Sequence, residues 1–121
     1  MMENHTTLVI GASENPERYA YMAAKMLQEH QIKTYAYGNK VGKIGEVDIF
    51  TDQKMIAVDT VTLYLGPKNQ ESIKDYVLRL KPRRVIFNPG TENPDWYPEL
   101  EKNGIQYEEA CTLVLLSTNS F

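Results

Sequence analysis

One stretch near the start of the chain decides the fold: Thr7-Leu8-Val9-Ile10-Gly11-Ala12-Ser13-Glu14-Asn15-Pro16. Its first four residues are apolar or β-branched and stop at a glycine, which is typical of a buried parallel strand. The polar residues that follow predict a tight turn, and Pro16 is expected in the first turn of a helix, where its missing N–H costs nothing. Apolar residues at helical spacing then run through residues 19–30, and a second strand is predicted at residues 32–37. This strand–turn–helix–strand unit covers about 30 residues, the size of a βαβ unit.

The rest of the chain repeats this alternation. Further strands are predicted at residues 47–50, 61–65, 84–87 and 105–108, and residues 39–46 and 51–58 are expected to be loops. A helix that Asn69 or Ser72 can cap and a helix at about residues 94–102 separate the later strands, and residues 111–116 are a short helix or strand. The alternation predicts a single α/β domain over residues 1–121. We expect a Rossmann-like, doubly wound three-layer sandwich with a mostly parallel sheet of about five or six strands in the order 3-2-1-4-5-6.

The composition limits the kinds of molecule that the protein is expected to bind. The 121 residues carry a net charge of −3, and a binder of nucleic acid would be expected to be basic. The apolar runs are too short to span a membrane, and the N-terminus lacks the features of a signal peptide. The single cysteine, Cys111, fits a reducing compartment. We therefore expect a cytoplasmic protein with a small-molecule nucleotide ligand and no nucleic-acid or membrane partner, and a homodimer stays open.

Four turns are expected to meet at one edge of the sheet, because ligands of doubly wound sheets bind outside the carboxyl ends of the strands. These turns are residues 11–18, 37–40, 66–69 and 88–90. Their Gly, Asn and Pro residues can simply be turn formers, but four such turns at one edge favour a site. In the first turn, a helix N-terminus offers free N–H groups to a phosphate, and Ser13 and Arg18 add a hydroxyl donor and a charged fork.

The first two turns argue against NAD. Ser13 and Pro16 stand where the fingerprint G-x-G-x-x-G has its second and third glycines. The second strand ends Tyr37-Gly38-Asn39-Lys40, without the carboxylate that binds the ribose hydroxyls of NAD. With a lysine there instead, a ligand carrying an extra phosphate is favoured. The Walker pattern G-x-x-x-x-G-K-[ST] is also absent.

No catalytic constellation stands out. His5 and His30 are expected to be solvated, and Cys111 is expected to be a small buried hydrophobe. Glu108 and Glu109 are neighbours in a strand and so point to opposite faces. The sequence also shows no metal-ligand spacing of His or Cys. We therefore predict no catalytic or metal-binding residue, and whether the protein is an enzyme stays open, with binding favoured.

The first loop resembles the opening of the small stand-alone CoA-binding proteins, which are relatives of the nucleotide-binding domain of succinyl-CoA synthetase α subunits. The matching residues are Val9-Ile10-Gly11-Ala12-Ser13-x-x-Pro16-x-Arg18-Tyr19-x-Tyr21. The resemblance continues in order through Val58-Asp59-Thr60-Val61-Thr62, Asn88-Pro89-Gly90 and Glu109-Ala110-Cys111-Thr112-Leu113-Val114. It therefore covers nearly the whole chain.

The resemblance implies a Rossmann-like fold that binds coenzyme A or an acyl-CoA. Because the sequence offers no strong catalytic candidate, we expect this binding to occur without catalysis. It implies a binding site made of Gly11, Ala12, Ser13, Pro16, Arg18, Tyr19, Gly38, Asn39, Lys40, Gly66, Pro67, Lys68, Asn69, Asn88, Pro89 and Gly90. At the second turn, many members of the family have V-N-P where this chain has Gly38-Asn39-Lys40. Two alternatives stay open: an accessory subunit of an enzyme that handles acyl-CoA, and a regulator that senses an NAD-type nucleotide.

Overall fold

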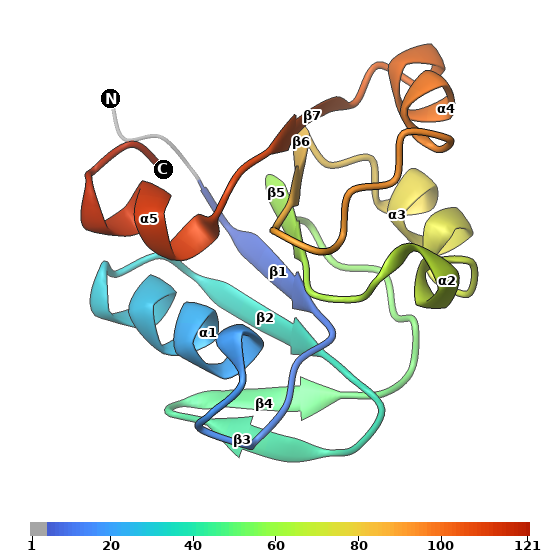
Figure 1. Ribbon diagram of the computed structural model, residues 1–121. Coiled ribbons are helices and arrows are strands. Elements are labelled where there is room, and N and C mark those ends of the chain that lie inside the picture. The colour runs from blue at the N-terminus through green and yellow to red at the C-terminus, as the bar shows by residue number, and fades with distance from the viewer. Residues whose placement is uncertain (1–4) are drawn as a thin grey trace.

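The computed structural model describes residues 5–121, which form a central sheet with helices on both faces (Figure 1). Within these residues the sheet has seven strands in the order β3-β4-β2-β1-β5-β6-β7. The parallel strands are β1 (Thr7–Ile10), β2 (Thr34–Tyr37), β4 (Val47–Phe50), β5 (Thr60–Leu63), β6 (Arg84–Phe87) and β7 (Gln106–Glu109). These are the six strands expected from the sequence, in the expected order. The predicted Rossmann-like class is therefore confirmed.

The seventh strand corrects the expected number of five or six. β3 (Gly42–Ile44) lies antiparallel to β4, in a segment that was expected to be a loop. A two-residue turn at Gly45 and Glu46 joins the two strands, and Gly45 has φ +61°, which favours glycine. The side chain of Gln28 holds this hairpin against the first helix, since it donates to the carbonyl of Ile44 and accepts from the amide of Glu46.

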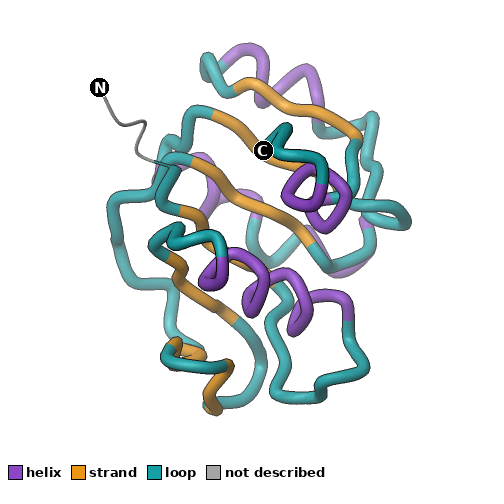
Figure 2. Tube along the Cα trace, turned by 90° about the vertical axis from the view of Figure 1, so that its left-hand side faces the viewer, coloured by secondary structure: helices purple, strands orange, loops and turns teal. Residues whose placement is uncertain are grey.

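The five helices of residues 5–121 are divided between the two faces of the sheet. α1 (Tyr19–Glu29) and α5 (Thr112–Ser117) pack on one face, in front of the sheet in Figure 2. α2 (Pro67–Gln70), α3 (Lys74–Leu80) and α4 (Tyr97–Lys102) pack on the other. Strands buried on both faces, such as β1 and β5, explain the continuous apolar runs in the sequence. The three layers are those of the predicted sandwich.

The helix starts differ from the predicted ones. Pro16 lies before α1, in a turn in which the amide of Arg18 donates to the carbonyl of Asn15. Neither Asn69 nor Ser72 caps a helix, because α2 begins at Pro67 after Gly66 and α3 has no side-chain cap. α5 decides the ambiguous segment 111–116 in favour of a helix. Within the described residues, no helix is both long enough and apolar enough to cross a membrane.

Candidate functional site

A cavity of about 1300 Å³ opens at the carboxyl edge of the sheet, where the four predicted turns meet. It is lined by residues 11–15, 17–20, 37–41, 64–66, 68–69, 71–73 and 89–91. Thirteen of the sixteen predicted site residues are among them. They are Gly11, Ala12, Ser13, Arg18, Tyr19, Gly38, Asn39, Lys40, Gly66, Lys68, Asn69, Pro89 and Gly90. The turns that the topology was expected to bring together therefore do surround one cavity.

Two glycines allow the first two loops and the β5 loop to come this close. Gly11 has φ +94°, and a Cβ there would lie 3.1 Å from the backbone of Tyr64. A Cβ on Gly38 would lie 2.4 Å from the carbonyl oxygen of Ala12, which no folded chain tolerates without a shift. The carbonyl of Tyr37 also accepts from the amides of Gly11 and Ala12, at 2.9 and 3.0 Å. Backbone-to-backbone contact thus fixes the first loop against the end of β2.

The first loop leaves the N-terminus of α1 open to the cavity. The hydroxyl oxygen of Ser13 accepts from the amide of Asn15 at 3.0 Å, so its proton remains available to a ligand. No side chain caps α1, and its first turn holds no acidic residue. The first-turn amides of a helix have no partner within the helix, and they carry a partial positive charge. Arg18, at the N-cap position, lines the cavity beside them. This arrangement suits an anion, above all a phosphate.

Cations and carboxylates are equal in number around the cavity. Arg18, Lys40 and Lys68 line it, and none of them makes an ion pair within the described part of the chain. Of the three carboxylates, Glu71 is paired with Lys74 at 2.8 Å, and Glu14 accepts from the backbone amide of Lys43 at 2.9 Å. Glu17 is exposed. The unpaired cations are thus free to meet the phosphates of a ligand.

Three predicted site residues do not line the cavity. Pro16 and Pro67 begin a turn and a helix and shape the loops from outside. Asn88, only 2% exposed, is buried next to Pro89, which does line the cavity. Its amide nitrogen donates to the hydroxyl of Thr62 at 2.6 Å and to the carbonyl of Leu63 at 2.8 Å, and its oxygen accepts from the amide of Thr112 at 2.8 Å. The side chain of Asn88 therefore joins β5, β6 and α5. From the sequence, it was expected either to contact a ligand or to form a turn.

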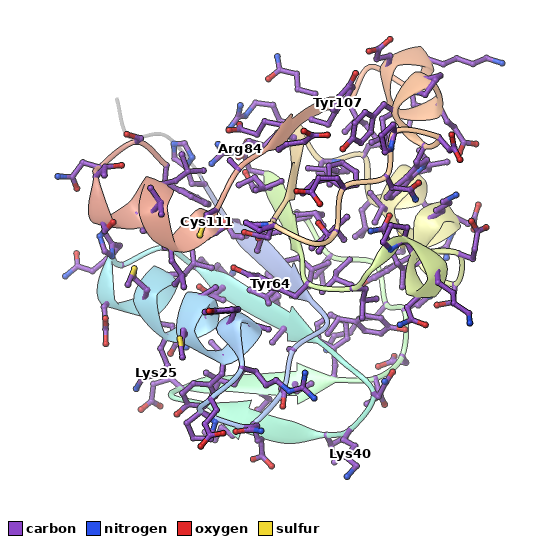
Figure 3. All side chains as sticks on the ribbon, in the orientation of Figure 1. Lys25, Lys40, Tyr64, Arg84, Tyr107 and Cys111 are labelled. Atoms are coloured by element: carbon purple, nitrogen blue, oxygen red, sulfur yellow. The ribbon has the colours of Figure 1, made fainter. Side chains whose placement is uncertain are left out.

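Sequence reasoning missed several lining residues next to the predicted turns, including Val41, Tyr64 and Thr91. Each lies within two residues of a predicted position, so a wider reading of each turn would have found them. Tyr64 lies on the α1 side of the sheet (Figure 3), and its hydroxyl is buried without a hydrogen-bond partner in the described residues. Burial raises the pKa of Tyr64 to about 12, so the phenol stays protonated at neutral pH.

The titratable residues that the sequence left aside serve the fold. His30 is exposed, as expected, and its ring nitrogens bond the carbonyl oxygens of Met26 and Leu116. His5 is half-buried against the ring of Phe121, so it is not simply solvated. Cys111 is half-buried, which corrects the expected full burial, and it does not line the cavity (Figure 3). Glu108 pairs with Arg84, and Glu109 accepts from the hydroxyl of Tyr97 at 2.7 Å. Within residues 5–121 there is no group of three or more His, Cys, Asp or Glu that could hold a metal ion.

Comparisons with known proteins agree with this geometry. A crystal structure described only as that of an uncharacterized protein is 45% identical, covers 99% of this chain and 100% of its own, and superposes with a TM-score of 0.95. A Thermus thermophilus structure is 20% identical over 98% of this chain and 91% of its own, with a TM-score of 0.85. A hypothetical protein from Pyrococcus horikoshii is 21% identical over 95% and 82%, with a TM-score of 0.83. The latter two show the fold alone.

The search of curated proteins finds no match. The family model described as the CoA binding domain, in contrast, matches residues 5–117, which include every residue that lines the cavity. With the fold, the open helix N-terminus and this match in agreement, the chain belongs to the CoA binding domain family.

Proposed function

We propose that this protein binds coenzyme A or an acyl-CoA in the cavity at the carboxyl edge of the sheet, without catalysing a reaction. The observation that carries the proposal is the uncapped N-terminus of α1, which opens into the cavity beside Arg18 in a member of the CoA binding domain family. The pyrophosphate of CoA fits this position, because a helix N-terminus and a guanidinium both attract phosphate.

The strand order suggests how the rest of the ligand would lie. In Rossmann-type sheets the adenosine half lies over the end of the second strand, on one side of the phosphate loop. Here that side is the loop after β2, with Gly38, Asn39 and Lys40. Lys40 has no acidic partner in the described residues and suits the 3′-phosphate of CoA. The pantetheine arm would then extend over the ends of β5 and β6, on the other side of β1.

Calorimetry with CoA, dephospho-CoA and NAD tests the proposal. We expect CoA to bind most tightly, because dephospho-CoA lacks the 3′-phosphate and NAD meets no carboxylate after β2. Arg18→Ala should weaken CoA binding by about tenfold or more, equal to about 1.4 kcal/mol. Lys25→Ala is the matched control, since it removes one cation from the same helix and lies away from the cavity (Figure 3). NAD binding as tight as that of CoA contradicts the proposal.

Lys40→Ala tests the orientation of the ligand. If Lys40 contacts the 3′-phosphate, the variant should bind CoA more weakly and dephospho-CoA as the wild type does. The difference in affinity between CoA and dephospho-CoA should then become smaller. An equal loss for both ligands would place the 3′-phosphate elsewhere. Turnover of an acyl-CoA by the purified chain would instead favour an enzyme.

A further inference from the structure

A buried glutamine joins the two loops on the far side of β1. Gln70, the last residue of α2, is 0% exposed. Its amide nitrogen donates to the carbonyl of Leu65 at 2.9 Å, in the loop after β5, and to the carbonyl of Thr91 at 2.7 Å, in the loop after β6. Its oxygen accepts from the side-chain amide of Asn93 at 2.9 Å. Every polar atom of this side chain is therefore used to hold one loop against the other.

The same two loops form one wall of the cavity. Leu65, Gly66 and Thr91 line it, and a Cβ on Gly66 would come within 3.9 Å of the carbonyl oxygen of Gly90. The loops thus run close together, and the side chains of Gln70 and Asn93 join them by hydrogen bonds. Asn93 is itself only 8% exposed, so the Gln70–Asn93 pair is largely shielded from water. The pair lies next to the cavity lining and is not part of it.

We propose that Gln70, with Asn93, is a positioning residue that sets the spacing of these two loops for the pantetheine arm of the ligand. This inference rests on the proposed function. With the phosphates at α1 and the adenosine over β2, the remaining part of the cavity lies over β5 and β6. Pantetheine contains two amide groups, and these need hydrogen-bond partners at fixed distances when they leave water. Loops held by a buried amide network offer such fixed partners at little further loss of entropy.

The wall also has the polarity that such an arm requires. Lys68, Asn69 and Ser72 line it beside the backbone of Gly66 and Gly90. An apolar chain would leave these groups without water or partners, whereas the amides of pantetheine can bond them. Gln70 acts through the loops and does not touch the ligand, so its loss should affect the arm and leave the nucleotide half of the ligand bound as before.

The test compares CoA with 3′-phospho-ADP, the nucleotide half of CoA that keeps the pyrophosphate. Gln70→Met keeps the length of the side chain and removes both donors and the acceptor. We expect the variant to bind CoA about tenfold more weakly, because two buried carbonyls lose their partner, and to bind 3′-phospho-ADP as the wild type does. Gln106→Met, at an exposed glutamine of β7, is the control and should change neither affinity.

Asn93→Ala provides a second variant in case Gln70→Met does not fold. It removes the donor to the side-chain oxygen of Gln70 and keeps both hydrogen bonds that Gln70 donates to the loop carbonyls. It should also weaken CoA selectively, and melting temperatures measured beside the affinities show that the protein is folded. Equal loss for both ligands, or no loss for either, overturns the positioning role and leaves the proposed function intact. A wild type that binds neither ligand overturns both.

Discussion

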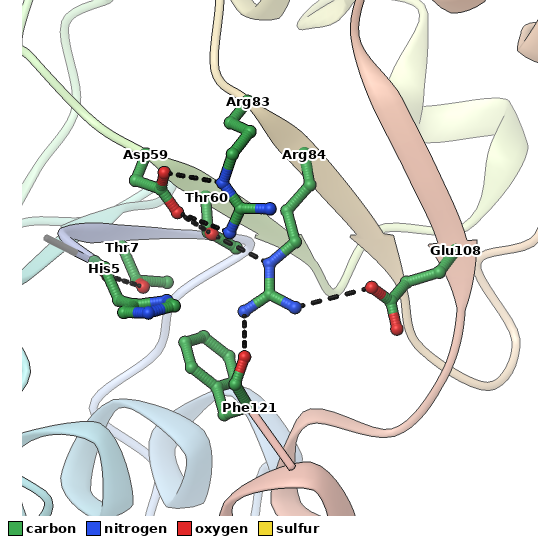
Figure 4. Close-up of polar contacts among 8 residues, drawn as sticks. All are labelled: His5, Thr7, Asp59, Thr60, Arg83, Arg84, Glu108 and Phe121. Atoms are coloured by element: carbon green, nitrogen blue, oxygen red, sulfur yellow. Dashed lines mark hydrogen bonds and ion pairs between the residues drawn. The ribbon is translucent and has the colours of Figure 1, made fainter. Parts of the chain in front are cut away.

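Arg83 and Arg84 are paired at the amino edge of the sheet, whereas the cations that line the cavity at its carboxyl edge are unpaired within the described residues. At the amino edge, Arg84 is 6% exposed and donates to the hydroxyl of Thr60, to Glu108 and to the carbonyl of Phe121, whose ring lies 4.3 Å from the guanidinium (Figure 4). Beside it, Arg83 donates two hydrogen bonds to the carboxylate of Asp59, of 2.9 and 3.0 Å (Figure 4). These charged and polar groups at the amino edge are thus hydrogen-bonded to one another, and they contribute to the stability of the fold.

At the carboxyl edge the groups are left open. Arg18, Lys40 and Lys68 have no ion-pair partner in the described residues, and the first turn of α1 has no cap. Polar groups that are paired inside a protein contribute to its stability, and groups left unpaired next to a cavity are available to a ligand. The difference teaches that the paired groups of the fold and the unpaired groups of the proposed binding site lie at opposite edges of one sheet. Variants at the two edges should therefore have separable effects.

The largest expected effect is on stability, at the amino edge. Arg84→Ala should lower the free energy of unfolding by about 3 kcal/mol, because it removes a buried cation and leaves Glu108, Thr60 and the carbonyl of Phe121 without their donor. Urea denaturation measures this loss. The affinity for CoA, measured where the variant is still folded, should not change. A stability loss below about 0.5 kcal/mol would mean that the hydrogen bonds of Arg84 contribute no more than an exposed ion pair does.

The next largest effect is expected at the carboxyl edge, on both the stability of the protein and its affinity for CoA. Gly38→Ala places a Cβ 2.4 Å from the carbonyl oxygen of Ala12, so the loop after β1 has to move. We expect a stability loss of about 1–2 kcal/mol, measured by thermal unfolding, together with weaker CoA binding, measured by calorimetry.

Gly104→Ala is the control for Gly38→Ala. Gly104 has φ +73°, and a Cβ there meets no atom within 4 Å, so the variant strains the backbone far from the cavity. It should lower stability without changing the affinity. Wild-type affinity in Gly38→Ala would show that the close packing of the first two loops is not needed for binding.

The smallest expected effect depends on pH. Burial acts to raise the pKa of Asp59, but hydrogen bonds from Arg83 and Thr60 outweigh it and hold the pKa below its ordinary value of 3.8. A carboxyl group with a lowered pKa in the folded state stabilises the fold above its unfolded pKa, and this contribution is lost as the pH falls through the folded pKa. Asp59→Asn should thus cost about 0.5–1 kcal/mol at neutral pH.

That cost should shrink in acid. Below about pH 4 the wild-type carboxyl begins to be protonated, so the unfolding free energies of wild type and Asp59→Asn should approach each other. Urea denaturation of both proteins at several pH values measures the difference. A difference that stays constant from neutral pH into acid would mean that the charge of Asp59 contributes nothing to the fold.

The sequence by itself determined the order of the six parallel strands and the place of the loop after β1. Both depend on short-range patterns: apolar runs such as that of β1, and glycines such as Gly11 and Gly38 that stop them. A parallel sheet with right-handed crossovers then brings the turns to one edge, whatever the details of the side chains. That is why the sequence also predicted most of the residues that line the cavity.

Only the tertiary structure decided which polar side chains line the cavity and which hold the loops. Asn88 turns inward to Thr112, 24 residues away, and Gln70 meets Asn93, 23 residues away. The strand β3 is likewise held to α1 by Gln28, whose side chain bonds the carbonyl of Ile44, 16 residues away. Such bonds join residues that are far apart in the chain, so no local pattern of sequence signals them. Burial decides them, because an amide that loses water must find its partner within the fold.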